Sequence, residues 1–219
     1  MKKLLPLILS TLLLTSCSGP DSSGGVEFSK TANAFPHGDC RGSGYQTHST
    51  ERTGCGWFTA NDKSYYIMPD ANLIGANLNN AHLDGSAISA AKLDGASLIK
   101  ASFVKSNLAG SDLSSANLTG ADLSNALLAG SQLIKTTLIS ADLSWANLQN
   151  SDLSNALAND ATLINANLLD ADISWTNLSG ANLTGAKTQG VTAVNTIYST
   201  STLCPNGLSW PTSGNDCPF

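Results

Sequence analysis

Charged residues are scarce in this sequence. Of 219 residues, 12% are charged and 6% are aromatic, and 11 basic against 16 acidic residues give a formal net charge of −5. Globular domains usually carry about 25% charged residues, so this composition argues against an ordinary globular enzyme. The shortage of Lys and Arg also disfavours nucleic-acid binding through phosphate contacts, which needs a basic surface.

The N-terminal apolar segment is too short to span a membrane. Leu4–Leu14 follows the basic residues Lys2 and Lys3, and a spanning helix needs about 20 apolar residues. A short basic region followed by a short apolar region is the order found in cleaved export signals. We therefore expect residues 1–16 to be a signal peptide.

The end of that segment, Leu14-Thr15-Ser16-Cys17, resembles the lipobox of bacterial lipoproteins. The resemblance implies that Cys17 is diacylated, with palmitate as a typical chain, and becomes the new N-terminus; two or more acyl chains make membrane attachment stable. Ser18 resembles the sorting pattern of Gram-negative outer-membrane lipoproteins. An ordinary secretory signal with a spare cysteine is the alternative.

The next segment is rich in Ser, Gly and Asp and cannot bury enough apolar area to fold. We expect residues 17–36 to be the lipidated cysteine followed by a flexible tether. The predicted location is therefore extracytoplasmic, on the outer membrane of a Gram-negative bacterium, with the membrane as the first partner.

A five-residue repeat fills the body of the chain. Residues 71–190 form 24 units without an insertion. The first residue of every unit is Ala, Ser or Thr, the third is Leu in 19 units, and the fifth is Gly, Asn or Asp in 16 units. A period of five matches neither an α-helix nor a flat strand, so a different geometry is required.

Each unit reads as a short extended piece with two inward residues, followed by a turn-forming corner. Four such pieces close a square, so residues twenty apart stack. The units resemble the pentapeptide-repeat family, as in Ala71-Asn72-Leu73, Ala121-Asp122-Leu123, Ala141-Asp142-Leu143 and Ala181-Asn182-Leu183. The resemblance implies an all-β, right-handed quadrilateral β-helix. Six coils at about 4.8 Å each would give a column about 29 Å tall.

Both ends of such a column need caps, because open strand edges promote aggregation. Aromatic residues concentrate before the repeat, so residues 37–70 are expected to form an N-terminal cap. Residues 191–219 are expected to form a C-terminal cap. The sequence Cys204-Pro205-Asn206-Gly207 resembles the endings of some exported family members.

Four cysteines remain after Cys17, and four allow three pairings. Caps at opposite ends of the column would leave only Cys40–Cys55 and Cys204–Cys217 within the limit of about 7 Å between Cα atoms. The expected exported location favours disulfides. Metal binding by His37, Cys40, His48 and Cys55 is the alternative, although their spacing matches no common zinc motif.

No catalytic motif stands out in the repeat. The pairs Asp122/Asp142 and Asp152/Asp172 should stack and have the chemistry for calcium or acid–base work, but Asp at this position is part of the repeat motif. We expect no catalytic site, cofactor or metal, with an envelope hydrolase as the enzyme alternative. Outward aromatic residues form the candidate binding surface: Trp145, Trp175 and Trp210.

The sequence therefore predicts a non-catalytic cell-envelope lipoprotein that serves as a β-helical scaffold or protein-binding surface. Glycan or cell-wall binding is the alternative. Some pentapeptide-repeat proteins that confer quinolone resistance resemble DNA and occupy topoisomerases. That function is least favoured here, because the export signal separates the chain from gyrase and residues 71–190 carry a net charge of only −4.

Overall fold

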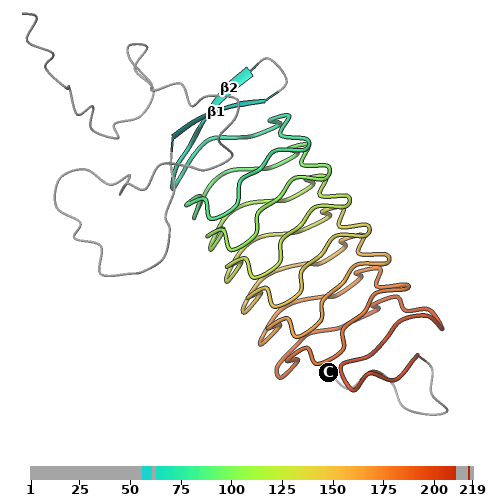
Figure 1. Cartoon of the computed structure of the whole chain (residues 1–219). Helices are drawn as coiled ribbons and strands as arrows, with labels where there is room; N and C mark the ends of the chain where they lie inside the picture. The colour runs from blue at the N-terminus through green and yellow to red at the C-terminus, as the bar shows by residue number, and fades with distance from the viewer. Residues whose placement is uncertain (1–55, 61–62, 211–216, 218–219) are drawn as a thin grey trace, which may run out of the picture.

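The computed structural model describes residues 56–60, 63–210 and 217. Strands β1 (Gly56–Ala60) and β2 (Lys63–Ile67) form an antiparallel hairpin. The chain then winds into a tall column of stacked coils (Figure 1). Among the described residues, no helix is long and apolar enough to cross a membrane.

Successive coils pair in parallel with a constant spacing. Bridges join second-position residues twenty apart, from Asn72↔Lys92 at one end to Asn177↔Ile197 near the other. A unit of five therefore occupies one quarter of a coil. The predicted β-helical fold is confirmed, and every outward side chain lies above its counterpart in the preceding coil.

Backbone hydrogen bonds hold this spacing. In a central unit, the Leu123 N–H donates to the Asp142 carbonyl at 2.7 Å, and the Asn125 N–H donates to the Ser144 carbonyl at 2.9 Å. A tight turn follows, because the Ala126 N–H donates back to the Leu123 carbonyl at 3.0 Å. The same pattern recurs along the column and pairs backbone groups that would otherwise be buried without partners.

Every corner residue of the repeat has a positive φ, between 55° and 75°. Glycine adopts this conformation freely, and Asn and Asp adopt it more readily than other residues with side chains. This requirement explains the preference at the fifth position. Lys, Ser, Ala and Trp also occupy corners, including Trp145 and Trp175 at φ 61°.

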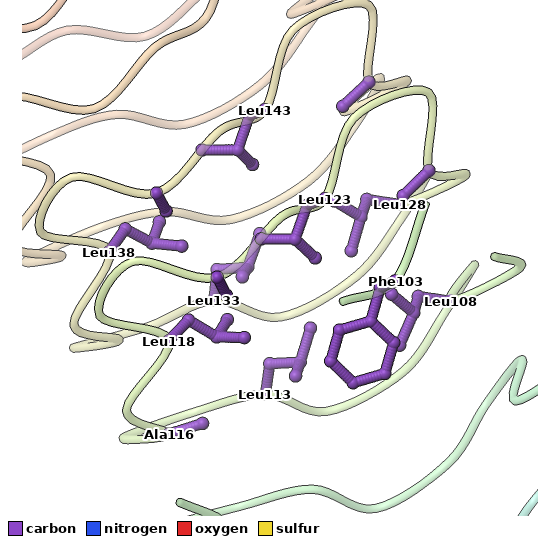
Figure 2. Close-up of a cluster of buried hydrophobic side chains, with 14 of the residues drawn as sticks. Phe103, Leu108, Leu113, Ala116, Leu118, Leu123, Leu128, Leu133, Leu138 and Leu143 are labelled. Carbon is purple, nitrogen blue, oxygen red and sulfur yellow. The ribbon is translucent and has the colours of Figure 1, made fainter. Parts of the chain in front are cut away.

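The first and third residues of each unit fill the column. The third-position Leu side chains are buried and stack in rows, and Figure 2 shows Phe103, Leu123 and Leu143 in successive coils. Small first-position residues such as Ala126 are also buried, where the backbone leaves little room. The inward assignment of both positions is confirmed.

Ala158 occupies a third position where most units have Leu, and the sequence suggests a void or a shift there. The coil keeps its register, since the Ala158 N–H donates to the Asn177 carbonyl at 2.8 Å. The neighbouring Leu157 points outward and is 44% exposed. This unit therefore has Ala inside and Leu outside, and its backbone pairing with the next coil is unchanged.

The ladder continues beyond residue 190, where the sequence places the start of the C-terminal cap. Thr192 bridges Asp172, and Asn182 bridges Leu203, a spacing of twenty-one that accommodates one extra residue. Backbone pairing does not require the Ala–Leu motif, so the coils continue after the sequence repeat has ended.

The chain ends by reversing on itself. Leu203 pairs in antiparallel with Ser209, and a disulfide joins Cys204 to Cys217 with their Cα atoms 5.2 Å apart. At the other end, Tyr65 of β2 packs against the core and its hydroxyl accepts the Asn77 N–H at 3.1 Å. Cys17, Cys40, Cys55, His37 and His48 lie outside the described residues.

We predict that Leu123→Lys prevents folding. Leu123 is fully buried between Phe103 and Leu143, and an unpaired charge in an apolar interior costs several kcal/mol. Circular dichroism during heating should show no cooperative transition. Ser124→Lys, at the outward neighbour, should melt as the wild type does; a wild-type melting curve for Leu123→Lys would contradict the packing described above.

We also predict that Ala158→Leu raises the melting temperature by several degrees. Leu at this position restores the row between Leu138 and Leu178, and filling a gap typically contributes about 0.5–2 kcal/mol. The matched control is Ala156→Leu, at a buried first position two residues earlier. It should lower the melting temperature through overpacking; equal effects of the two changes would disprove the prediction.

Candidate binding surface

The coil spacing divides the outward residues into four flat sides. We name them by the first residues of their units: side A (71, 91, 111, 131, 151, 171), side B (76, 96, 116, 136, 156, 176), side C (81, 101, 121, 141, 161, 181) and side D (86, 106, 126, 146, 166, 186). The units at 191 and 196 extend sides A and B.

Acidic residues segregate between these sides. All carboxylates at second or fourth positions lie on the two opposite sides A and C: Asp84, Asp94, Asp112, Asp122, Asp142, Asp152 and Asp172. Asp160 and Asp170 occupy corners, and the second and fourth positions of sides B and D carry no acidic residue. The column therefore alternates acidic and largely uncharged surfaces.

These carboxylates have a local structural task. The Asp142 carboxylate accepts the Ser144 N–H at 2.8 Å, and Asp172 accepts the Ser174 N–H at the same distance. Amides from Asn147 and similar second-position residues make the same bond. Each second-position Asp thus closes a turn within its own unit, which agrees with its interpretation as part of the repeat motif.

The structure does bring together the two predicted carboxylate pairs, since Asp122 bridges Asp142 and Asp152 bridges Asp172. Within the described part of the chain, however, no three His, Cys, Asp or Glu residues gather in a way that could hold a metal ion. The stacking of these pairs follows from the twenty-residue coil and requires no ligand.

His82 is the histidine of the repeat and lies on side C beside Ser102. The Ser102 hydroxyl donates to Asp84, whose carboxylate also accepts the Val104 N–H at 2.9 Å. Across the described residues, no hydrogen bond links His82 to this pair. Because no described histidine is hydrogen-bonded to Ser102, the group lacks the Ser–His–Asp arrangement of a nucleophilic triad.

The predicted aromatic residues do not form one surface. Trp145 and Trp175 are 62% and 58% exposed at corners of sides C and A. They are thirty residues apart, which is one and a half coils, so they occupy opposite corners of the column. Trp210 is half-buried and packs on Tyr198 with ring centroids 4.9 Å apart.

A different apolar surface gathers at the C-terminal end of sides A and B. We call it the end patch, and its residues are Leu157, Trp175, Val194 and Ile197. The Trp175 N–H donates to the Val194 carbonyl at 2.8 Å, and Asn177 bridges both Leu157 and Ile197. The repeat of residues 71–190 does not include this patch, because Val194 and Ile197 follow residue 190; extending the five-residue register places both outward.

Comparison with known proteins supports the interpretation of the repeat. The family model for pentapeptide repeats matches eight copies, over residues 68–103, 86–120, 116–155 and 146–185. Among curated proteins, no sequence is significantly similar to this chain.

Several solved structures resemble the chain. The pentapeptide repeat protein Rfr23 from the cyanobacterium Cyanothece 51142 is 28% identical over 48% of this chain and 62% of its own, less than two thirds of its length, with a TM-score of 0.30. QnrB1, a plasmid-mediated fluoroquinolone resistance protein, is 16% identical over 58% of this chain and 67% of its own, with a TM-score of 0.47.

A pentapeptide repeat protein from the thylakoid lumen of Arabidopsis thaliana is 25% identical over 55% of this chain and 68% of its own, with a TM-score of 0.18. The family model itself spans residues 68–185, which is more than half of the 219 residues. It also coincides with the twenty-residue ladder and the positive-φ corners. The chain therefore belongs to the pentapeptide repeat family.

Proposed function

We propose that this protein is a non-catalytic lipoprotein of the cell envelope, in which the β-helix acts as a scaffold that binds other proteins. The proposal rests on the observation that each position of the five-residue unit has its own structural role. First and third residues fill the interior, second-position carboxylates and amides close turns, and only flat outward surfaces remain. Flat surfaces suit docking better than they suit catalysis, which needs a concave site.

The proposed molecule has five parts: a signal peptide (1–16), a lipidated Cys17 with its tether (17–36), an N-terminal cap (37–70), the repeat column (71–190) and a C-terminal cap (191–219). The column is a right-handed quadrilateral of about six coils. A Cys40–Cys55 disulfide would close the first cap, as Cys204–Cys217 closes the second. The acyl chains on Cys17 attach the N-terminal end to the outer membrane of a Gram-negative bacterium.

Glycan or cell-wall binding is the second candidate. Trp145 and Trp175 favour it, because more than half of each side chain is exposed at a corner and an indole ring can stack on an apolar sugar face. Their opposite positions would allow the column to bridge two chains rather than grip one. Trp210 is less suited, since Tyr198 covers part of its ring.

Topoisomerase inhibition is the least favoured function. Duplex DNA carries about one negative charge per 1.7 Å of its axis, whereas residues 71–190 hold nine Asp against five Lys. The carboxylates also lie on two sides instead of following a continuous path around the column. A supercoiling assay would overturn this ranking if the protein inhibited gyrase strongly.

We predict that Cys17→Ser releases the protein from the membrane. Cells labelled with radioactive palmitate should incorporate label into the wild type and not into the variant, and the variant should move to the soluble fraction after lysis. Cys55→Ser is the matched control, which should keep both the label and the membrane fraction. Labelled Cys17→Ser in the membrane pellet would contradict the anchor.

Chemical cross-linking of intact cells distinguishes a protein scaffold from a glycan-binding module. With the lipidated full-length chain, we expect a dominant envelope protein in the cross-linked product, identified by mass spectrometry. Recovery of cell-wall glycan alone, with loss of cell-wall co-sedimentation in Trp145→Ser or Trp175→Ser, would favour the second candidate over the first.

A further inference from the structure

The last coil leaves a strand edge open on side A. Towards the column, the Thr192 N–H donates to the Ala171 carbonyl at 2.9 Å, and the Thr192 carbonyl accepts the Ile173 N–H at 2.8 Å. On the outer edge, the N–H groups of Ala193 and Asn195 and the carbonyl of Val191 have no partner among the residues that the structure describes.

The end of the opposite side, side C, is closed by the chain itself. There the Trp210 N–H donates to the Thr202 carbonyl at 3.0 Å, and the Cys204 N–H donates to the Leu208 carbonyl at 2.9 Å. Within the described residues, side A has no such pairing, and its inward residues Val191 and Ala193 are only half-buried, whereas Ala171 and Ile173 one coil earlier are buried. The 191–195 segment therefore presents an unpaired strand edge at the end of side A.

The pattern within the column defines what fits this edge. Between full coils, the first-position carbonyl accepts one N–H from the next coil, and the third- and fifth-position N–H groups donate to two of its carbonyls. Val191, Ala193 and Asn195 present these three groups. They are complementary to a short extended backbone that runs parallel to the edge.

The surrounding side chains define the composition of that segment. Val194 and Ile197 are 55% and 51% exposed next to Trp175, so the end patch offers apolar contact. Asp172 lies below Thr192 in the stacked column, and Asp152 lies below Asp172. An apolar segment with Lys or Arg beside its apolar residues would satisfy both the patch and the carboxylates.

We propose that the 191–195 edge binds an extended, basic and apolar segment of a partner protein by parallel strand addition, with the end patch holding the apolar side chains. This inference rests on the proposed scaffold function, since it names the partner's chemistry. It does not depend on lipidation, so the peptide test and the Cys17→Ser test can fail separately.

The test uses the full-length chain in detergent and a fluorescent nonapeptide that alternates Val and Thr with Lys. Fluorescence anisotropy should show saturable binding. N-methylation of the central amides should weaken it about tenfold by removing the donor and blocking close approach, and replacing Lys by Glu should also weaken it. Equal binding of the methylated peptide would overturn strand addition.

Hydrogen exchange locates the contact. On binding the Lys peptide, exchange of the Ala193 and Asn195 amides should slow about tenfold, because new hydrogen bonds protect them. Unchanged exchange at these amides, or protection confined to another side, would overturn the proposal. If the protein self-associated through this edge and the peptide did not compete, the proposal of a partner segment would be overturned, and a second copy of this chain would be the ligand of the edge.

Two variants complete the test. Ala193→Pro removes a central donor that the column does not use, and proline is tolerated on a free strand edge; Trp175→Ser removes apolar contact. Both should weaken peptide binding about tenfold at an unchanged melting temperature. Trp145→Ser, on the opposite corner, is the matched control, and an equal loss in this variant would contradict the assignment. If Ala193→Pro failed to fold, the methylated peptide would still test the same bonds.

Discussion

The structure depends on the return of the chain to the same side after twenty residues. This spacing places each Leu on the Leu of the next coil and each second-position residue beside its counterpart, as in Asp122↔Asp142. It requires a left-handed backbone at every corner, which the fifth residue supplies. Apolar packing and backbone pairing therefore reinforce each other, as expected for a solenoid in which each unit contacts only its neighbours.

Most of this fold can be predicted from the sequence because one physical rule repeats 24 times. A small inward residue, a large inward residue and a corner residue recur without an insertion. An uncertain assignment in one unit is therefore corrected by the register of its neighbours. The positive φ at Trp145 and Trp175 shows that register overrides local preference. The ladder beyond residue 190 was unpredictable from the motif, since backbone pairing at Thr192 needs no Leu beside it.

The candidate surface was less predictable for the same reason. The repeat dictates which residues face outward, so an outward Asp or Asn carries little information about function. The twenty-residue spacing would have separated Trp145 from Trp175. The same spacing, extended past residue 190, would have placed Val194 and Ile197 outward, because Thr192 and Ile197 still pair with the residues twenty earlier. The Ala–Leu motif has already ended there, so the motif alone did not mark these residues as part of the column.

The two kinds of surface on a solenoid recognise partners by different physics. Along the sides, neighbouring coils use the backbone groups, so recognition must come from side chains, here acidic on A and C and largely uncharged on B and D. At an end, the backbone itself is available and imposes direction and spacing on a partner. The end of side C is covered by the Leu203–Ser209 bridge and the Cys204–Cys217 disulfide. At the end of side A, Ala193 is half-buried and Asn195 is exposed. A partner at the end of side A would therefore have to match the spacing of the Val191 carbonyl and of the Ala193 and Asn195 N–H groups, whereas a partner along a side would be recognised by side chains.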